Sequence, residues 1–286
     1  MRAPQTSVLV GAYRDVEALE VLMAALVGQT RLPDEVVVAE DGSDPAMAEW
    51  VRRLDLPFPV RHTHGVDEGW TKNRSMNRAI RAATGEYLLF LDEDCPPLPG
   101  WVAGHLALAR EGTILAGRRV DLGPGFSERL RSGELHPIKL GRRLLRSWRA
   151  LGKDGTRHLE EGLAFPPRRF FLGLQARLRK KAWLVGCNWS CFAADLHAIN
   201  GFDEDFDAPC YGEDLDLERR FKLLGITTRS ARNVAAVLHL FHEKRFDEAG
   251  RDRMRQLMES RPEDPRCVHG IVHLDQPPAD GQSTTR

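Results

Sequence analysis

The chain has 286 residues, and its 41 basic and 41 acidic side chains cancel. A chain of this length can bury a hydrophobic core without disulfide bonds. The neutral balance excludes the strongly cationic class of general nucleic-acid binders, so any electrostatic argument is local. Five scattered cysteines, no readable secretory signal and no membrane-length apolar stretch lead us to expect a cytoplasmic protein with free thiols.

The first third of the chain alternates short apolar runs with amphipathic ones. This alternation predicts parallel strands joined by crossover helices. We expect strands over 7–12, 35–39, 58–62 and 86–91, and helices over 16–27, 46–54 and 71–83. The run 86–91 is almost wholly apolar, which is typical of a central strand buried on both faces.

The alternation stops near Gly123, and residues 126–181 are rich in arginine and lysine. Apolar residues recur at helical spacing over 137–151, which predicts a basic amphipathic helix. Two interpretations stay open: the helix contacts a membrane or an anionic acceptor, or it packs its apolar face on the domain and leaves its arginines in water.

The remainder of the chain has a globular pattern until its last residues. We expect a short strand over 184–186, an amphipathic helix over 212–224 and a strand over 234–240. From about Asp275 the chain is rich in proline, aspartate, glycine and threonine, and we expect disorder there.

Acidic residues follow the buried strand directly, as Asp92, Glu93 and Asp94. Open α/β sheets bind their ligands at the carboxyl ends of parallel strands. An extended D-x-D splays its carboxylates, so that one can bind a hard cation and the other the ligands of that cation. In the aspartate-nucleophile phosphatases a D-x-D follows the first strand, whereas this one lies well along the chain. The motif therefore predicts a magnesium or manganese site.

Two further groups of polar residues lie at predicted element ends. Glu40 and Asp41 follow a strand, where a carboxylate can accept the imide hydrogen of uracil, although a turn with a helix cap is an equal interpretation. Lys72 and Arg74 begin the helix over 71–83. Cations at a helix N-terminus oppose its dipole and so favour a neighbouring anion such as a diphosphate.

Glu213 and Asp214 lie in the first turn of the helix over 212–224. Acidic residues there are ordinary helix stabilisers. These two also lie beside the first apolar turn, where they can face a cleft and act on a proton.

Taken in order, these motifs resemble those of family 2 glycosyltransferases of the GT-A fold, over Ser7 to about His242. The region after Gly201 is also similar to galactosyl- and N-acetylgalactosaminyltransferases. The matching segments are Val8–Arg14, Glu40–Ser43, Lys72 with Arg74 and Asn77, Asp92–Asp94, Gly201–Glu204 and Gly212–Leu217. Gly11 and Ala12 replace the usual Pro-Thr, and the basic stretch 126–181 has no counterpart that we can match.

The resemblance implies a Rossmann-like, mostly parallel α/β sheet flanked by helices, with a basic helical insertion. It divides the chain into a nucleotide-sugar-binding half (1–122), the insertion (123–182), an acceptor and catalytic part (183–258) and a partly disordered tail (259–286).

Roles for individual residues also follow from the resemblance. Asp214 would be the general base, with Glu213 beside it, and Gly186, Asn188 and Trp189 would form the acceptor wall, although Trp189 fits a core position equally well. The metal ligands would be Asp94, Asp92 and one of His239 and His242. The nucleotide pocket would be lined by Ala12, Tyr13, Arg14, Glu40, Asp41, Lys72, Arg74, Asp92 and Glu93.

The expected activity is transfer of a sugar from a UDP-sugar, dependent on Mn²⁺ or Mg²⁺, to an acceptor nucleophile with inversion. Retention by the same fold and a catalytically degenerate nucleotide-sugar-binding module stay open as alternatives. A nucleotidyltransferase would need a glycine-rich N-terminal loop that this chain lacks. The acceptor class (glycan, small molecule, lipid-linked molecule or peptide) stays undefined, and nucleic acid is not expected. The segment 137–151 is where a peripheral membrane contact would lie under the first of its two interpretations.

Overall fold

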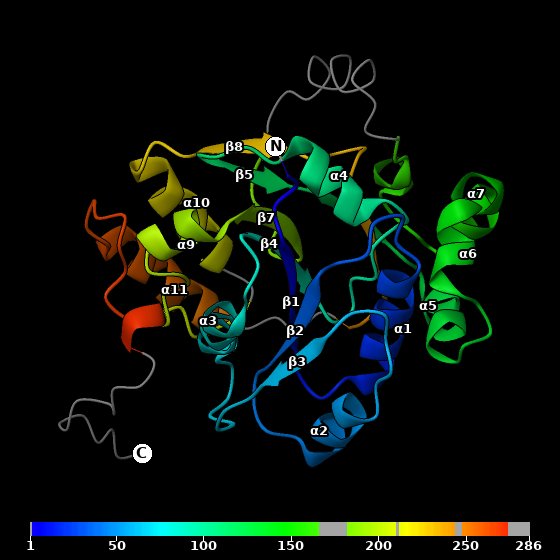
Figure 1. Cartoon of the computed structure of the whole chain (residues 1–286), viewed down its shortest axis with the longest axis horizontal. Helices are drawn as coiled ribbons and strands as arrows, with labels where there is room; N and C mark the ends of the chain where they lie inside the picture. Colours follow the sequence, from blue (N-terminus) through cyan, green and yellow to red (C-terminus); the bar gives the residue numbers. More distant parts are fainter. Residues whose placement is uncertain (1, 166–181, 210–211, 244–247, 274–286) are drawn as a thin grey trace.

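The computed structural model describes residues 2–165, 182–209, 212–243 and 248–273. Its centre is a seven-stranded sheet in the order β3-β2-β1-β4-β7-β5-β8, beside a two-stranded sheet of β6 and β9 (Figure 1). The strands are β1 (Thr6–Ala12), β2 (Glu35–Glu40), β3 (Val60–Thr63), β4 (Tyr87–Asp92), β5 (Thr113–Ala116), β6 (Arg118–Asp121), β7 (Asn188–Phe192), β8 (Thr227–Ser230) and β9 (Ala236–His239).

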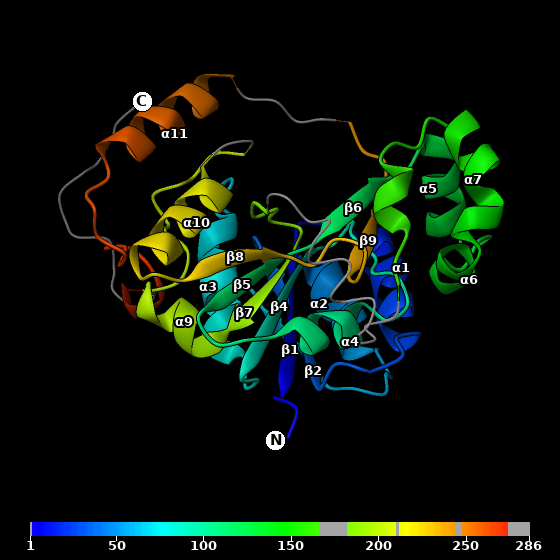
Figure 2. The same cartoon turned by 90° about the horizontal axis from the view of Figure 1, so that it is seen from above.

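Helices cover both faces of the large sheet, as Figure 2 shows. The α-helices are α1 (Val16–Val27), α2 (Pro45–Arg52), α3 (Lys72–Ala82), α4 (Trp101–Leu108), α5 (Pro124–Arg131), α6 (Pro137–Arg142), α7 (Leu144–Lys153), α9 (Ala193–Ala198), α10 (Glu213–Leu223) and α11 (Glu248–Ser260). Two short 3₁₀ helices are η1 (Leu159–Gly162) and η2 (Ile271–His273).

The two faces of β1 and β4 bury different side chains, because neighbouring residues of a strand point to opposite sides. Val8 and Val10 pack with α1, α2 and α4, whereas Leu9 and Phe90 pack with α3, α9 and α10. This double burial confirms the predicted mostly parallel α/β sheet, in which β1 pairs in parallel with both β2 and β4.

The predicted strand over 184–186 is wrong: the chain forms its strand later, as β7, which lies antiparallel between β4 and β5. Buried polar residues explain the error, because Asn188 and Ser190 interrupt the apolar pattern of β7. Their side chains are satisfied inside the protein. Trp101 Nε1 donates to Asn188 Oδ1 over 2.9 Å, and Tyr87 Oη lies 2.7 Å from Ser190 Oγ.

The single helix predicted over 137–151 is in fact α6 and α7, which are separated at Arg143. A Cβ on Gly141 would lie 2.8 Å from Pro99 Cδ, so α6 packs closely on the loop after β4. Leu140, Leu144 and Leu151 are buried in one cluster with residues of α1. The apolar side of this region therefore packs on the domain, as the second interpretation expects.

The described part of the predicted tail, residues 259–273, packs against the domain rather than leaving it. Ile271 is buried with residues of α3, α9 and α10, and its N–H donates to Asn200 O over 3.0 Å. The disorder expected from Asp275 lies outside the described residues. Within the described ranges, no helix combines the length and apolar character needed to cross a membrane.

Candidate active site

The carboxyl end of β4 brings acidic and basic side chains together. Asp92 ends the strand, and Lys72 reaches it from the first turn of α3, with 2.9 Å between Lys72 Nζ and Asp92 Oδ1. Glu213 of α10 approaches the same ammonium group at 3.2 Å. Burial opposes the charge of Lys72, but Asp92, Glu213 and Asp214 raise its pKa well above its usual value. Lys72 is thus a fixed cation at this edge of the sheet.

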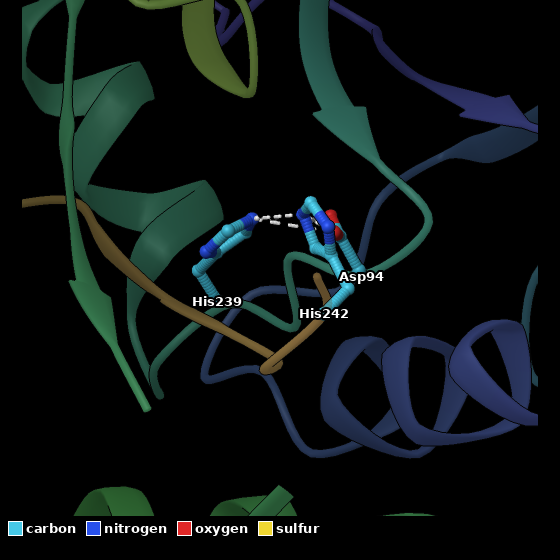
Figure 3. A group of neighbouring side chains, drawn as sticks. All are labelled: Asp94, His239 and His242. Carbon is cyan, nitrogen blue, oxygen red and sulfur yellow. Dashed lines mark hydrogen bonds and ion pairs between the residues drawn. The ribbon is translucent and has the colours of Figure 1, made fainter. Parts of the chain in front are cut away.

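Asp94, His239 and His242 form a compact group beyond β4 (Figure 3). Asp94 Oδ2 lies 3.2 Å from His239 Nε2 and 3.3 Å from His242 Nε2. On its other side, His239 Nδ1 lies 3.3 Å from Asp121 Oδ1, so the ring is held between two carboxylates. A metal-binding histidine commonly has its second nitrogen held by a carboxylate in this way.

The chemistry of this group fits a divalent cation. One oxygen and two imidazole nitrogens can all lie within 4.8 Å of one another. Such a mixed set suits a first-row cation such as Mn²⁺ better than Mg²⁺, which favours oxygen ligands. Although burial opposes both charges, the contact between Asp94 and His239 lowers the pKa of Asp94 to about 2 and, with Asp121, raises that of His239 to about 9. Positive charge is therefore favoured at this position. Both late histidines reach Asp94, whereas Asp92 pairs with Lys72.

Asp214 lies in the first turn of α10, facing the loop before β7. Its Oδ2 accepts a hydrogen bond from the Gly186 N–H over 2.9 Å, while its Oδ1 is buried without a hydrogen-bond partner among the described residues. Burial and the neighbouring Glu213 raise the pKa of Asp214 to about 7, against the opposite effect of Lys72. A carboxyl with a pKa near neutrality is suited to accepting a proton. Gly186 permits this contact, because a Cβ there would lie 2.6 Å from Asp214 Oδ1.

The ends of β1, β2 and β4 bring four of the expected nucleotide-pocket residues together. Ala12 O accepts from the Asp41 N–H over 2.8 Å, and the Tyr13 N–H donates to Glu93 Oε2 over 2.9 Å. Asp41 in turn accepts from the Thr71 N–H over 2.9 Å, at the start of α3. These contacts join the carboxyl ends of β1 and β2 to the helix that carries Lys72.

Three other expected pocket residues make different contacts. Glu40 is 1 % exposed and bonds the Asp44 N–H and His62, which matches the turn-and-cap alternative because Asp44 caps α2. Arg74 pairs with Glu68 and Glu204 on another side of α3 from Lys72. Arg14 is exposed and pairs with an acidic residue of the loop before α3.

The expected acceptor wall is wrong at two of its three residues, because both are buried in the core. Trp189 is 1 % exposed and stacks on Phe90, with ring centroids 3.8 Å apart. Asn188 is fully buried, and its Nδ2 donates to Arg118 O over 2.8 Å. Gly186 alone of the three lies beside Asp214.

Replacement of Trp189 by alanine should therefore act on stability. We expect Trp189→Ala to lower the free energy of unfolding by about 3–5 kcal/mol, because a large core aromatic leaves a cavity when it is truncated. Denaturant unfolding followed by circular dichroism would measure the loss. Trp189→Phe should retain most of the stability. A Trp189→Ala protein of unchanged stability would contradict the core assignment.

Asp121 is a site residue that the sequence analysis missed. It ends β6 and lies opposite His239 in the parallel pair of β6 and β9. Arg119 and Arg157 both pair with its carboxylate, at 3.0 and 3.2 Å. Asp121 comes close to His239 because β6 pairs with β9, which lies far away in the sequence. A local sequence motif therefore does not predict this contact.

The mostly parallel sheet, with β7 antiparallel within it and an acidic loop after β4, matches solved structures of GT-A glycosyltransferases. One similar structure is a mannosyltransferase from Pyrobaculum calidifontis in complex with GDP-Man and Mn²⁺, with a TM-score of 0.55 and 16 % identity over 85 % of this chain and 59 % of that one. Another is GalNAc-T7 with UDP, GalNAc and Mn²⁺, with a TM-score of 0.57 and 11 % identity over 85 % of this chain and 45 % of that one.

Sequence comparison gives the family. The model of glycosyl transferase family 2 matches residues 7–190, and the chain belongs to this family. Similar curated proteins include the chondroitin synthase of Escherichia coli, 27 % identical over 225 residues, which are 72 % of this chain and 32 % of that protein. The validoxylamine A glucosyltransferase of Streptomyces hygroscopicus subsp. limoneus is 29 % identical over 233 residues, 78 % of this chain and 49 % of that protein. The chain thus spans half or less of the length of these relatives.

Proposed function

We propose that the protein transfers a sugar from a nucleotide diphosphate sugar, with UDP-sugar as the donor, to an acceptor nucleophile. The observation that carries this proposal is the contact of Asp94 with both His239 and His242, beside the Lys72–Asp92 pair. Membership of a glycosyltransferase family supports the reaction class, and two similar folds are known with Mn²⁺ and a nucleotide or nucleotide sugar.

In this proposal one group of the described residues binds the donor. Asp94, His239 and His242 would hold Mn²⁺, which when bound stabilises the negative charge of the departing diphosphate. Lys72 supplies a second, permanent positive charge near the same group. Ala12, Tyr13, Asp41 and Glu93 surround the nucleotide end of the donor.

Asp214 is the general base of the proposed reaction. Its carboxylate takes the proton of the acceptor as the acceptor oxygen or nitrogen attacks the anomeric carbon from the face opposite the diphosphate, and the bond between that carbon and the diphosphate breaks. The new bond then has inverted configuration. Glu213 of α10 forms an ion pair with Lys72 of α3, and this pair links the two helices.

The setting of the enzyme is part of the same proposal. The cysteines of the described ranges, namely Cys95, Cys187, Cys191 and Cys267, are free and buried, which supports a cytoplasmic location. The acceptor is a sugar, lipid-linked molecule, peptide or small molecule rather than a nucleic acid, since the net charge of the chain is zero.

Calorimetric titration tests the donor assignment. We expect UDP-sugars to bind the protein in the presence of Mn²⁺ and to lose most of this affinity in chelator, because the diphosphate shares the cation with the protein. A panel of GDP-, UDP- and TDP-sugars measures the base preference. Failure of every nucleotide to bind would contradict the proposal. Binding without a hydrolysed or transferred sugar would instead favour the catalytically degenerate nucleotide-sugar-binding module.

A further inference from the structure

The segment that forms α6 and α7 concentrates positive charge on a chain whose total charge is zero. Between Pro137 and Lys153 there is no aspartate or glutamate. The basic residues of this segment, all of them exposed, are Lys139, Arg142, Arg143, Arg146, Arg149 and Lys153. Within the ranges that the structure describes, none of them forms an ion pair. This excess of charge faces water without local compensation.

Helix α11 is also rich in arginine, but its arginines have acidic partners. Arg253 pairs with Asp207 at 2.7 Å, and Arg255 lies 3.9 Å from Glu259. A run of six exposed cations without an ion pair among the described residues therefore distinguishes the α6–α7 segment from α11, and it calls for an anionic partner.

Helix α7 also exposes an apolar side chain among its cations. Leu144 and Leu151 are buried and hold the helix on the domain, whereas Leu145 is 69 % exposed. Arg149 is one helical turn beyond Leu145, so the two side chains are neighbours on the outer surface. A leucine exposed among cations can enter the apolar region of a lipid surface while the cations stay at the level of the head groups.

We propose that the basic face of α6 and α7, made of these six cations and Leu145, docks on an anionic lipid surface. Phosphate head groups would pair with the cations, while Leu145 enters the apolar region below them. A nucleic acid or a polyanionic glycan would attract the same charges but offers no apolar phase to the leucine. Lipid is thus the partner that accounts for both kinds of side chain.

The position of these helices connects the docking face to the candidate site. Figure 2 shows α5, α6 and α7 together at one end of the molecule, next to α1 and on the side of β6 and β9. Phe241 lies between His239 and His242 in the sequence. Its N–H donates a hydrogen bond to Ser127 Oγ of α5 over 2.7 Å. Docking would therefore hold the histidine segment near the lipid surface, where an acceptor carried by the membrane is accessible. This step rests on the proposed function, whereas the docking itself does not.

Vesicle co-sedimentation of the full chain tests the proposal. We expect binding to vesicles of phosphatidylcholine mixed with phosphatidylglycerol, and little to phosphatidylcholine alone. The double variant Arg146→Gln, Arg149→Gln should bind about 25-fold more weakly, because each basic residue near an anionic surface contributes roughly fivefold. Leu145→Ser should bind more weakly as well, and its deficit should persist at high salt, since the apolar contribution is not screened.

The matched control is Arg253→Gln with Arg255→Gln on α11, which removes the same charge from another helix and should bind vesicles like the unmodified protein. Circular dichroism of each variant verifies folding. Equal binding by the α7 variant and the α11 control, or no binding to anionic vesicles, would overturn the proposal. Binding to heparin or DNA with no binding to vesicles would overturn it too, in favour of a polyanion. Because nucleotide titration needs no vesicles, a failure of docking is distinguishable from a failure of the proposed reaction.

Discussion

Replacement of Asp94 by asparagine should weaken Mn²⁺ binding by at least about 100-fold, since even the outer partners of metal ligands contribute 10–100-fold to affinity. Asp94 is the side chain that both His239 and His242 contact, so its loss removes the anionic member of the group. Titration of Mn²⁺, followed by the electron paramagnetic resonance of the free ion, measures the affinity without any substrate. Binding of the UDP-sugar should fall in parallel.

Two further variants make this result specific. Asp121→Asn removes the carboxylate that holds His239 Nδ1 and should weaken Mn²⁺ by about tenfold, as expected for an outer partner. Asp55→Asn changes an exposed carboxylate before β3 and should leave the affinity unchanged. If Asp94→Asn kept the affinity of the unmodified protein for Mn²⁺, the assignment of this group as the metal site would be wrong.

Replacement of Asp214 by asparagine should lower the rate of transfer by about 1,000-fold, the middle of the range for loss of a general base. The amide keeps the shape of the side chain and can still accept the Gly186 N–H through its oxygen, so folding should be preserved. Affinity for the nucleotide should stay nearly intact, because in the proposed reaction Asp214 acts on the acceptor. Steady-state kinetics and calorimetry on the same preparation measure the two properties.

The control for Asp214 is again Asp55→Asn, which should transfer at the normal rate. A fall of both nucleotide affinity and rate in Asp214→Asn would indicate misfolding, which thermal unfolding can detect. A normal rate in a folded Asp214→Asn protein would exclude this residue as the base and direct attention to Glu213, its neighbour in the first turn of α10.

Much of the fold could be predicted because its central elements carry their own signals. Helix α1 has the predicted bounds, with an Asp15 side chain that caps its first turn and Gly28 at its end. Strand β4 is apolar because helices cover both of its faces. Strand β7 could not be predicted from hydropathy, since Asn188 and Ser190 are buried polar residues whose partners lie far away in the sequence.

The candidate site also combines residues that the sequence predicts with contacts that it does not predict. Asp94 and the late histidines could be predicted because they lie at or just beyond the ends of recognisable strands, and their order matches the GT-A resemblance. Their contact depends on β9 lying beside β6 and on the loop after β4, which no short window of sequence encodes. Trp189 was open to two interpretations because an aromatic ring suits both a sugar and a core. Burial against Phe90 decides for the core.

The path of the chain around the site also bears on how such proteins diversify. The stretch between Asp121 and Gly186 connects two residues of the candidate site. The Asp121 carboxylate contacts His239, and the Gly186 N–H donates to Asp214. In the described part of that stretch, residues 122–165 and 182–185, no strand of the seven-stranded sheet occurs. Evolution, or an engineer, can therefore vary this stretch without changing the strands of that sheet, provided that the leucines that pack on α1 are kept.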